Sequence, residues 1–174
     1  MRSGFVTLVG RPNVGKSTLL NRILGTKVAI TSDKPQTTRT RIMGVLTRPD
    51  SQVVFVDTPG IHKPRTAMGT RLNATAQGTI SDVDVVCFVL DASQPFGRGD
   101  QWVANLVPND AVCIVNKVDK ASKKEVADQL VAAAGLSLSE YFPVSAKTGD
   151  GIEALVAHLI QRLPDGPRYF PDDM

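Results

Sequence analysis

One stretch constrains this chain more than any other: the eight residues GRPNVGKS at positions 10–17. They fit the pattern G-x-x-x-x-G-K-[ST], in which a glycine-rich turn brings backbone N–H groups close to phosphate oxygens. Residues 5–9 are apolar and typical of a buried strand, and residues 17–24 fit the helix that should follow it. Strand, loop and helix in this order predict a phosphate-binding loop at the start of a helix.

Each polar residue of this loop has an expected role. The Lys16 ammonium can reach the β- and γ-phosphates of a nucleotide, and the Ser17 hydroxyl can bind Mg²⁺. The positive end of the following helix adds to the attraction for phosphate. The predicted phosphate contacts are Asn13, Val14, Gly15, Lys16, Ser17 and Thr18.

Length and composition are those of an ordinary globular domain. The chain has 174 residues, of which 42% are apolar, and it contains no apolar run long enough to predict a membrane span. Residues 1–4 lead directly into the first expected strand, without a signal-peptide pattern. Cys87 and Cys113 lie in apolar runs, which favours reduced, buried thiols in an intracellular protein. The net charge of +3 favours a polyanionic partner only weakly.

Strand-like and helix-like stretches alternate along the chain. This alternation predicts an α/β fold with a mostly parallel six-stranded sheet and helices on both faces. Asp100 is the expected N-cap of one helix, and Ser122 with Glu125 forms a capping box for the next. The expected strands are 5–9, 42–48, 52–57, 83–90, 111–115 and 141–144, and the expected helices are 17–24, 72–80, 100–107, 122–134 and 151–163.

Polar motifs follow several of the expected strands, at the sheet edge where α/β proteins bind ligands. Asp57 ends one strand and can hold Mg²⁺ through water, while Gly60 can offer its N–H to a γ-phosphate. Thr37 and Thr38 lie in a long polar segment, where a hydroxyl can complete the Mg²⁺ ligands once a triphosphate is bound. Taken alone, Asp-x-x-Gly is also a common turn.

Two further motifs predict a guanine site. In the motif NKVD at 116–119, the Asp119 carboxylate can accept hydrogen bonds from the ring N–H and the amine of guanine. Adenine lacks this pair of donors. The Lys117 stem can lie along the base, and the motif SAK at 145–147 can offer a backbone N–H to the guanine carbonyl. The predicted base contacts are Asn116, Lys117, Asp119, Ser145, Ala146 and Lys147.

The motifs GRPNVGKS, TT, DTPG, NKVD and SAK occur in the order found in translation-factor-class GTPases, which the chain resembles over residues 5–163. The segments VAITSDKPQTTR at 28–39 and DTPGIHKP at 57–64 are similar to those of the Era family, within the TrmE-Era-EngA class. The related Der family shares GRPNVGKS but usually carries a GTTRD loop, where this chain has QTTRT.

The resemblance implies a GTPase domain at residues 1–163 and a linker at 164–174 toward an absent C-terminal KH domain. It implies hydrolysis of GTP to GDP and phosphate, with Mg²⁺ bound by Ser17, Thr38 and Asp57, and catalysis by Lys16, Thr38, Gly60 and Asn13. It further implies a cytoplasmic switch in 30S subunit assembly and 16S rRNA maturation. RNA would bind through the missing domain, and a peripheral association with the membrane is compatible with this.

Two residues bear on the rate of hydrolysis. Ile61 follows DTPG where Ras-like GTPases carry the glutamine that orients water, so we expect slow intrinsic turnover. Asn13 either helps to bind K⁺ beside the phosphates, as in related GTPases, or only shapes the turn.

Other interpretations of the chain stay open at this point. Basic residues near the two switch segments form either an RNA-facing patch or a solvated surface. His62 could assist chemistry but is more simply an exposed loop residue; His158 is expected on the surface and Trp102 in helix packing. Besides the Era-like GTPase, the alternatives are a Der-like large-subunit GTPase, a nucleotide-gated binding module with negligible turnover, and a P-loop kinase or ATPase. The basic residues are Lys34, Arg39, Arg41, Arg48, Lys63, Arg65 and Arg71.

Overall fold

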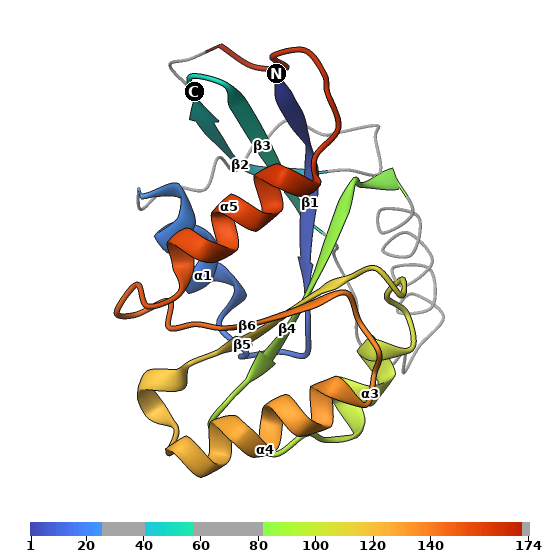
Figure 1. Ribbon diagram of the computed structural model, residues 1–174, viewed down its shortest axis with the longest axis vertical. Helices are drawn as coiled ribbons and strands as arrows, with labels where there is room; N and C mark the ends of the chain where they lie inside the picture. Colours follow the sequence, from blue (N-terminus) through green and yellow to red (C-terminus); the bar gives the residue numbers. More distant parts are fainter. Residues whose placement is uncertain (26–40, 58–81, 172–174) are drawn as a thin grey trace.

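The computed structural model describes residues 1–25, 41–57 and 82–171, and these form a six-stranded sheet with flanking helices (Figure 1). The strand order is β2-β3-β1-β4-β5-β6; β2 runs antiparallel to β3 and every other neighbouring pair is parallel. The predicted α/β fold is confirmed. The elements are β1 (Arg2–Val9), α1 (Lys16–Leu24), β2 (Arg41–Arg48), β3 (Ser51–Asp57), β4 (Val85–Asp91), α3 (Arg98–Ala104), β5 (Val112–Asn116), a 3₁₀ turn (Val118–Lys120), α4 (Lys123–Ala134), β6 (Glu140–Pro143) and α5 (Ile152–Arg162).

Alternate residues of the central strands face opposite sides of the sheet and feed two separate cores. In β4, Cys87 and Val89 belong to the core under α1 and α5, whereas Phe88 and Leu90 belong to the core under α3 and α4. Figure 1 shows α1 and α5 together, apart from α3 and α4. Because both faces of the sheet are covered, the sequence of β4 is a continuous apolar run and does not alternate between apolar and polar residues.

Two helix starts test the capping predictions. The capping box at the start of α4 is confirmed, because Ser122 Oγ accepts from Glu125 N at 3.1 Å and Glu125 Oε1 accepts from Ser122 N at 2.9 Å. The predicted N-cap at Asp100 is wrong: α3 begins at Arg98 with Gly97 as N-cap. Asp100 is the third helical residue, and its Oδ2 accepts from Gly97 N at 2.9 Å.

Residues 164–171, which follow α5, lie against the first residues of β1 and β3. Gly166 N donates to Met1 O at 2.9 Å, and Ser3 Oγ donates to Pro167 O at 2.6 Å. The fully buried Gln52 side chain exchanges two hydrogen bonds with the backbone of Phe170, at 2.9 and 3.0 Å. The segment forms one isolated β-bridge and no helix, and it is held by side-chain and backbone contacts along β1 and β3.

The remaining packing predictions have mixed outcomes. Both cysteines are free and buried, and Trp102 packs against the core under α3 and α4, as predicted. The prediction that His158 lies on the surface is wrong: it is half-buried against Phe142, with ring centroids 5.1 Å apart, and its Nε2 is buried. None of the described helices has the length and apolar character that crossing a bilayer requires. The helix expected at 72–80 lies outside the described residues.

Candidate nucleotide-binding site

The phosphate loop connects β1 to α1 and needs glycine at two positions. Gly15 has φ +95°, and a Cβ there would lie 2.5 Å from Asn116 Nδ2. A Cβ on Gly10 would lie 2.7 Å from the carbonyl oxygen of Val89 in β4. The loop is therefore pressed against two neighbouring strand ends, which leaves no room for side chains at either glycine.

Lys16 begins α1 and lies partly buried over the loop that precedes it. Its Nζ donates to the carbonyl oxygen of Gly10 at 2.8 Å. Burial lowers the pKa of the Lys16 ammonium, and the nearby charge of Asp57 opposes this shift. The N-cap residue of α1 is Gly15, which has no side chain to cap the helix, so within the described part of the chain the first N–H groups of the helix remain available to an anion. A phosphate would supply both the counter-charge and the missing acceptors.

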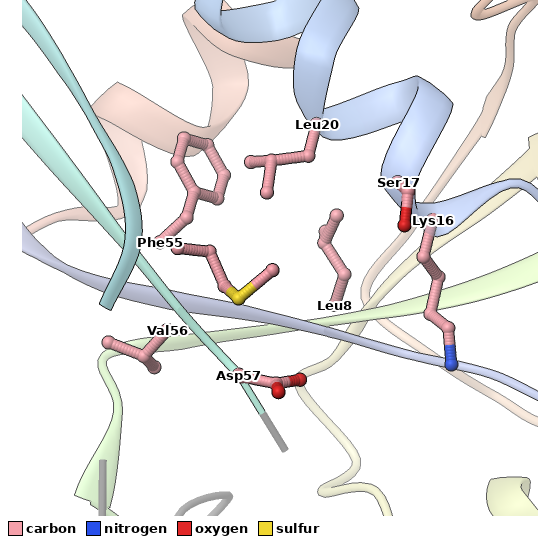
Figure 2. Close-up of a pocket in the computed structure, with 8 residues that line it drawn as sticks. Leu8, Lys16, Ser17, Leu20, Phe55, Val56 and Asp57 are labelled. Atoms are coloured by element: carbon pink, nitrogen blue, oxygen red, sulfur yellow. The ribbon is translucent and has the colours of Figure 1, made fainter. Parts of the chain in front are cut away.

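Figure 2 shows Ser17 and Lys16 at the start of α1 and Asp57 at the end of β3, around one pocket. Its inner wall is apolar and includes Leu8, Leu20 and Phe55. A hydroxyl and a carboxylate are hard oxygen ligands, and Mg²⁺ in nucleotide sites takes one or two such groups with phosphates and water. The pair fits the predicted magnesium site. The third predicted ligand, Thr38, lies outside the described residues.

Lys117 joins the base-binding motif to the phosphate loop. It has φ +67°, and its Nζ donates to the carbonyl oxygen of Asn13 at 2.7 Å and to Asp91 Oδ2 at 3.1 Å. Burial raises the pKa of Asp91, but hydrogen bonds from Ser93 and the Lys117 ammonium outweigh it and leave the pKa lowered. Asp91 is therefore a charged anchor that holds the Lys117 stem in place.

Asn116 connects three loops through one amide group. Its Nδ2 donates to the carbonyl oxygen of Val14 at 3.0 Å, and its Oδ1 accepts from Ala146 N at 3.1 Å. Both hydrogen bonds are buried, and only 1% of Asn116 is exposed. The predicted guanine contact at this position thus also fixes the distance between the phosphate loop and the SAK motif.

Asp119 is held by the second guanine motif. Its Oδ1 accepts from Ser145 Oγ at 2.7 Å, and Ser145 Oγ accepts in turn from Thr148 N at 3.0 Å. Ser145 is fully buried, whereas Asp119 is exposed. The bond to Ser145 orients the exposed Asp119 carboxylate, and a carboxylate that accepts hydrogen bonds from two guanine donors must be held in this way.

The structure brings together the described residues predicted for phosphate, magnesium and guanine, on loops at the carboxyl ends of β1, β3, β5 and β6. Several other predictions fall outside the described part. They concern Lys34, Thr37, Thr38, Arg39, Gly60, Ile61, His62, Lys63, Arg65 and Arg71.

Three residues that support this site were not predicted from the sequence. Asp91 ends β4 and could have been found by the same strand-end rule that selected Asp57. Arg11 Nε pairs with the buried Asp100 Oδ1 at 3.1 Å and ties the phosphate loop to α3. Arg22 on α1 donates to the carbonyl oxygens of residues 146 and 147. The contact of Arg11 spans 89 residues and those of Arg22 span more than 120, so no local sequence pattern predicts them.

A phosphate loop between β1 and α1, an aspartate at the end of β3 and two base-binding motifs after β5 and β6 define a P-loop nucleotide-binding domain of the GTPase type. A family model described as 50S ribosome-binding GTPase matches residues 5–117, and the chain belongs to this family.

Curated relatives named GTPase Era resemble the chain over nearly its whole length. The protein from Mycobacterium avium (strain 104) is 49% identical over 178 residues, which cover 98% of this chain and 60% of that protein. The protein from Nocardioides sp. is 47% identical, over 98% of this chain and 58% of its own length. The predicted resemblance to Era is confirmed, and the chain spans about 60% of the length of these relatives.

Two solved Era structures share this fold, and each comparison covers 100% of this chain. A variant of Aquifex aeolicus Era bound to GDP·AlF4⁻ is 36% identical with a TM-score of 0.81. Era in complex with MgGDPNP and nucleotides 1506–1542 of 16S ribosomal RNA is 37% identical with a TM-score of 0.82. This chain covers 61% of each of those chains.

Proposed function

We propose that this chain binds GTP with Mg²⁺ and hydrolyses it to GDP and phosphate, as the switch domain of a ribosome-assembly GTPase. The observation that carries the proposal is the bonded connection between phosphate loop and base motifs through Asn116 and Lys117. The names of the relatives, GTPase Era, support it, as does the nucleotide in the two similar structures.

In this proposal the chain's own residues mainly hold and orient the nucleotide. Lys16 exchanges its bond to Gly10 for one to the β- and γ-phosphates, and its partly buried ammonium offsets charge that develops on them. Ser17 and Asp57 would hold Mg²⁺, directly or through water, which would supply positive charge beside the phosphate oxygens. Thr38 and Gly60 respond to the γ-phosphate, so that its loss changes the surface that a partner recognises.

The proposed target is the small ribosomal subunit. One of the two similar structures holds Era together with nucleotides 1506–1542 of 16S ribosomal RNA, which supports a role in 30S assembly and 16S rRNA maturation. The relatives extend beyond the part that this chain matches, which is consistent with an RNA-binding KH domain after residues 164–174. We propose a cytoplasmic protein, and cell fractionation tests whether it also associates peripherally with the membrane.

Crosslinking of the native full-length protein to RNA in cells, followed by sequencing of the bound RNA, tests this target. Enrichment near the 3′ end of small-subunit ribosomal RNA is the expected result. Enrichment of large-subunit RNA would contradict it and favour the Der-like alternative, for which the description of the matching family, 50S ribosome-binding GTPase, is the supporting observation. RNA no more abundant than in an uncrosslinked control would contradict both.

Ile61 favours one variation on this proposal. An isoleucine cannot hydrogen-bond the attacking water, so hydrolysis in the isolated chain would act only as a slow timer on a nucleotide-gated binding module. A single-turnover measurement with and without ribosomal particles distinguishes an activated GTPase from such a binding module. Strong stimulation by the particles indicates an activated GTPase, and an unchanged slow rate indicates a binding module.

A further inference from the structure

Arg22 lies near the end of α1, the helix that begins at the phosphate loop, and reaches across to the loop after β6. Its Nε donates to the carbonyl oxygen of Ala146 at 2.8 Å, and its Nη2 donates to the carbonyl oxygen of Lys147. One edge of a rigid guanidinium therefore binds two consecutive carbonyl groups. This contact fixes the orientation of the peptide unit that joins residues 146 and 147.

The other half of this peptide unit is the N–H of Lys147. In a trans peptide the N–H points away from the carbonyl of the same unit, and the described chain contains no cis peptide bond. With its carbonyl turned toward Arg22, the unit turns this N–H to the opposite side. Donation by a cation to the carbonyl also polarises the amide and strengthens its N–H as a donor.

The backbone N–H groups around Lys147 are already in use. Ser145 N donates to Asp150 O at 2.9 Å, Ala146 N donates to Asn116 Oδ1 at 3.1 Å, and Thr148 N donates to Ser145 Oγ at 3.0 Å. Gly149 N donates to Ser145 O at 2.8 Å. Within residues 145–149, all of which the structure describes, the N–H of Lys147 is the one without an acceptor.

We propose that Arg22 is a positioning residue that aims the backbone N–H of Lys147 at the carbonyl oxygen of a bound guanine. Asp119, held by Ser145 two residues earlier in the same loop, would take the donors on the opposite part of the base edge. The proposal rests on the proposed GTP-binding function and adds a residue of α1 to the determinants of base specificity.

The test combines a change in the protein with a change in the ligand. GDP and 6-thio-GDP differ in the atom at position 6, where sulfur is a weaker hydrogen-bond acceptor than oxygen. Their dissociation constants are measured by calorimetry at neutral pH with the 174-residue chain, its Arg22→Gln and Arg22→Lys variants, and Lys124→Gln. Lys124 lies on α4 and is exposed, so Lys124→Gln is a matched loss of one positive charge outside the loop after β6.

We expect the wild type and Lys124→Gln to prefer GDP over 6-thio-GDP. Arg22→Gln should weaken GDP binding about fivefold, which corresponds to the loss of one ordinary hydrogen bond. It should also bring the ratio of the dissociation constants for 6-thio-GDP and GDP close to one. Arg22→Lys, which keeps one charged donor, should give an intermediate ratio. The ¹⁵N–H resonance of Lys147 should move downfield on addition of GDP in the wild type and much less in Arg22→Gln.

Two results would overturn the proposal. If Arg22→Gln weakens the binding of GDP and of 6-thio-GDP equally, Arg22 only stabilises the fold. If the Lys147 resonance responds to GDP equally in both proteins, the peptide unit does not depend on Arg22. Failure of the proposed function looks different, because the wild type itself would then bind GDP no better than ADP.

Discussion

Asn116 binds the backbone on either side of the predicted base pocket, and a single substitution tests how much this connection contributes. Asn116→Ala removes the bonds to Val14 O and Ala146 N, at 3.0 and 3.1 Å, and leaves both groups buried without a partner. At about 1 kcal/mol or more for each group, or about 2 kcal/mol together, we expect a loss of GDP affinity of about 30-fold or more.

Calorimetric titration with GDP checks this expectation, with Asn105→Ala as the control. Asn105 caps the end of α3 and its exposed side chain accepts a hydrogen bond from the exposed Gln101, so its replacement should leave GDP affinity unchanged. A loss of less than threefold in Asn116→Ala would show that the two loops hold their spacing without this amide.

Asn13 has φ +68°, a conformation that asparagine tolerates better than alanine does, and its carbonyl oxygen accepts from Lys117 Nζ. Its shape-forming role can therefore be separated from K⁺ binding by two substitutions. Glycine keeps the backbone conformation and removes the side chain, whereas alanine removes the side chain and strains the backbone. If the side chain binds K⁺, GTP hydrolysis in the wild type should be faster in K⁺ than in Na⁺.

Both Asn13→Gly and Asn13→Ala should then lose this difference between K⁺ and Na⁺. Steady-state phosphate release in the two salts at equal ionic strength is the measurement. Persistence of the K⁺ effect in Asn13→Gly would assign Asn13 to the turn alone, and equal wild-type rates in both salts would remove the K⁺ site.

At the scale of elements, residues 164–171 show contacts that their sequence does not predict. Their proline and glycine content predicts a linker, and in the structure Tyr169 packs on Phe5 with ring centroids 5.0 Å apart, while Phe170 joins the apolar cluster of β2 and β3. Gln52 in β3 is fully buried because it binds the N–H and the carbonyl of Phe170.

Replacing Gln52 with alanine should therefore cost about 2–3 kcal/mol in the free energy of unfolding, because two backbone groups lose their partners. The same substitution in a chain that ends at residue 163 should cost less than about 1 kcal/mol, since the partners are already absent. Urea denaturation of the long and short chains, each as wild type and with Gln52→Ala, completes this double-mutant cycle. Equal costs in the long and short chains would show that residues 164–171 do not stabilise the sheet.

Elements set by local sequence signals could be predicted here, whereas contacts between distant segments could not. The strands and α4 follow from local signals: continuous apolar runs, and the Ser122–Glu125 capping box. The residues proposed to bind phosphate, magnesium and guanine were selected from motifs at strand ends, and the structure places the described ones on neighbouring loops. The Asp100 prediction failed because the residue caps from inside the helix and is drawn into a buried pair with Arg11. The contacts of Arg22 and Gln52 join segments more than 100 residues apart, and only the folded sheet brings them together.

At the scale of the whole molecule, the two cores make stability depend on pH in the alkaline range. Burial raises the pKa of both Cys87 and Cys113 to about 12, from 9.0. Between these values the unfolded chain releases thiol protons that the folded chain keeps, so the free energy of unfolding falls as pH rises. The expected slope is up to about 1.4 kcal/mol per pH unit for each thiol.

Urea denaturation at several pH values from 9 upward should show this slope in the wild type and a shallower one in the variant with both cysteines replaced by alanine. Identical slopes in the two proteins would mean that other groups account for the pH dependence. In the native protein at about pH 8, neither thiol should react with a thiol reagent within minutes, and both should react on unfolding.

The whole molecule is expected to select guanine through Asp119 and to hydrolyse its triphosphate slowly. The most direct measurement is turnover of GTP, ATP and XTP by the wild type, Asp119→Asn and the exposed control Asp128→Asn. Xanthine carries an oxygen where guanine carries the 2-amine, so an amide at 119 can donate to it. We expect GTP turnover on the order of 10⁻³ per second or below in wild type and control, no ATP turnover, and a switch to XTP in Asp119→Asn. ATP turnover equal to that of GTP, or an unchanged preference in Asp119→Asn, would contradict selection of guanine by this carboxylate.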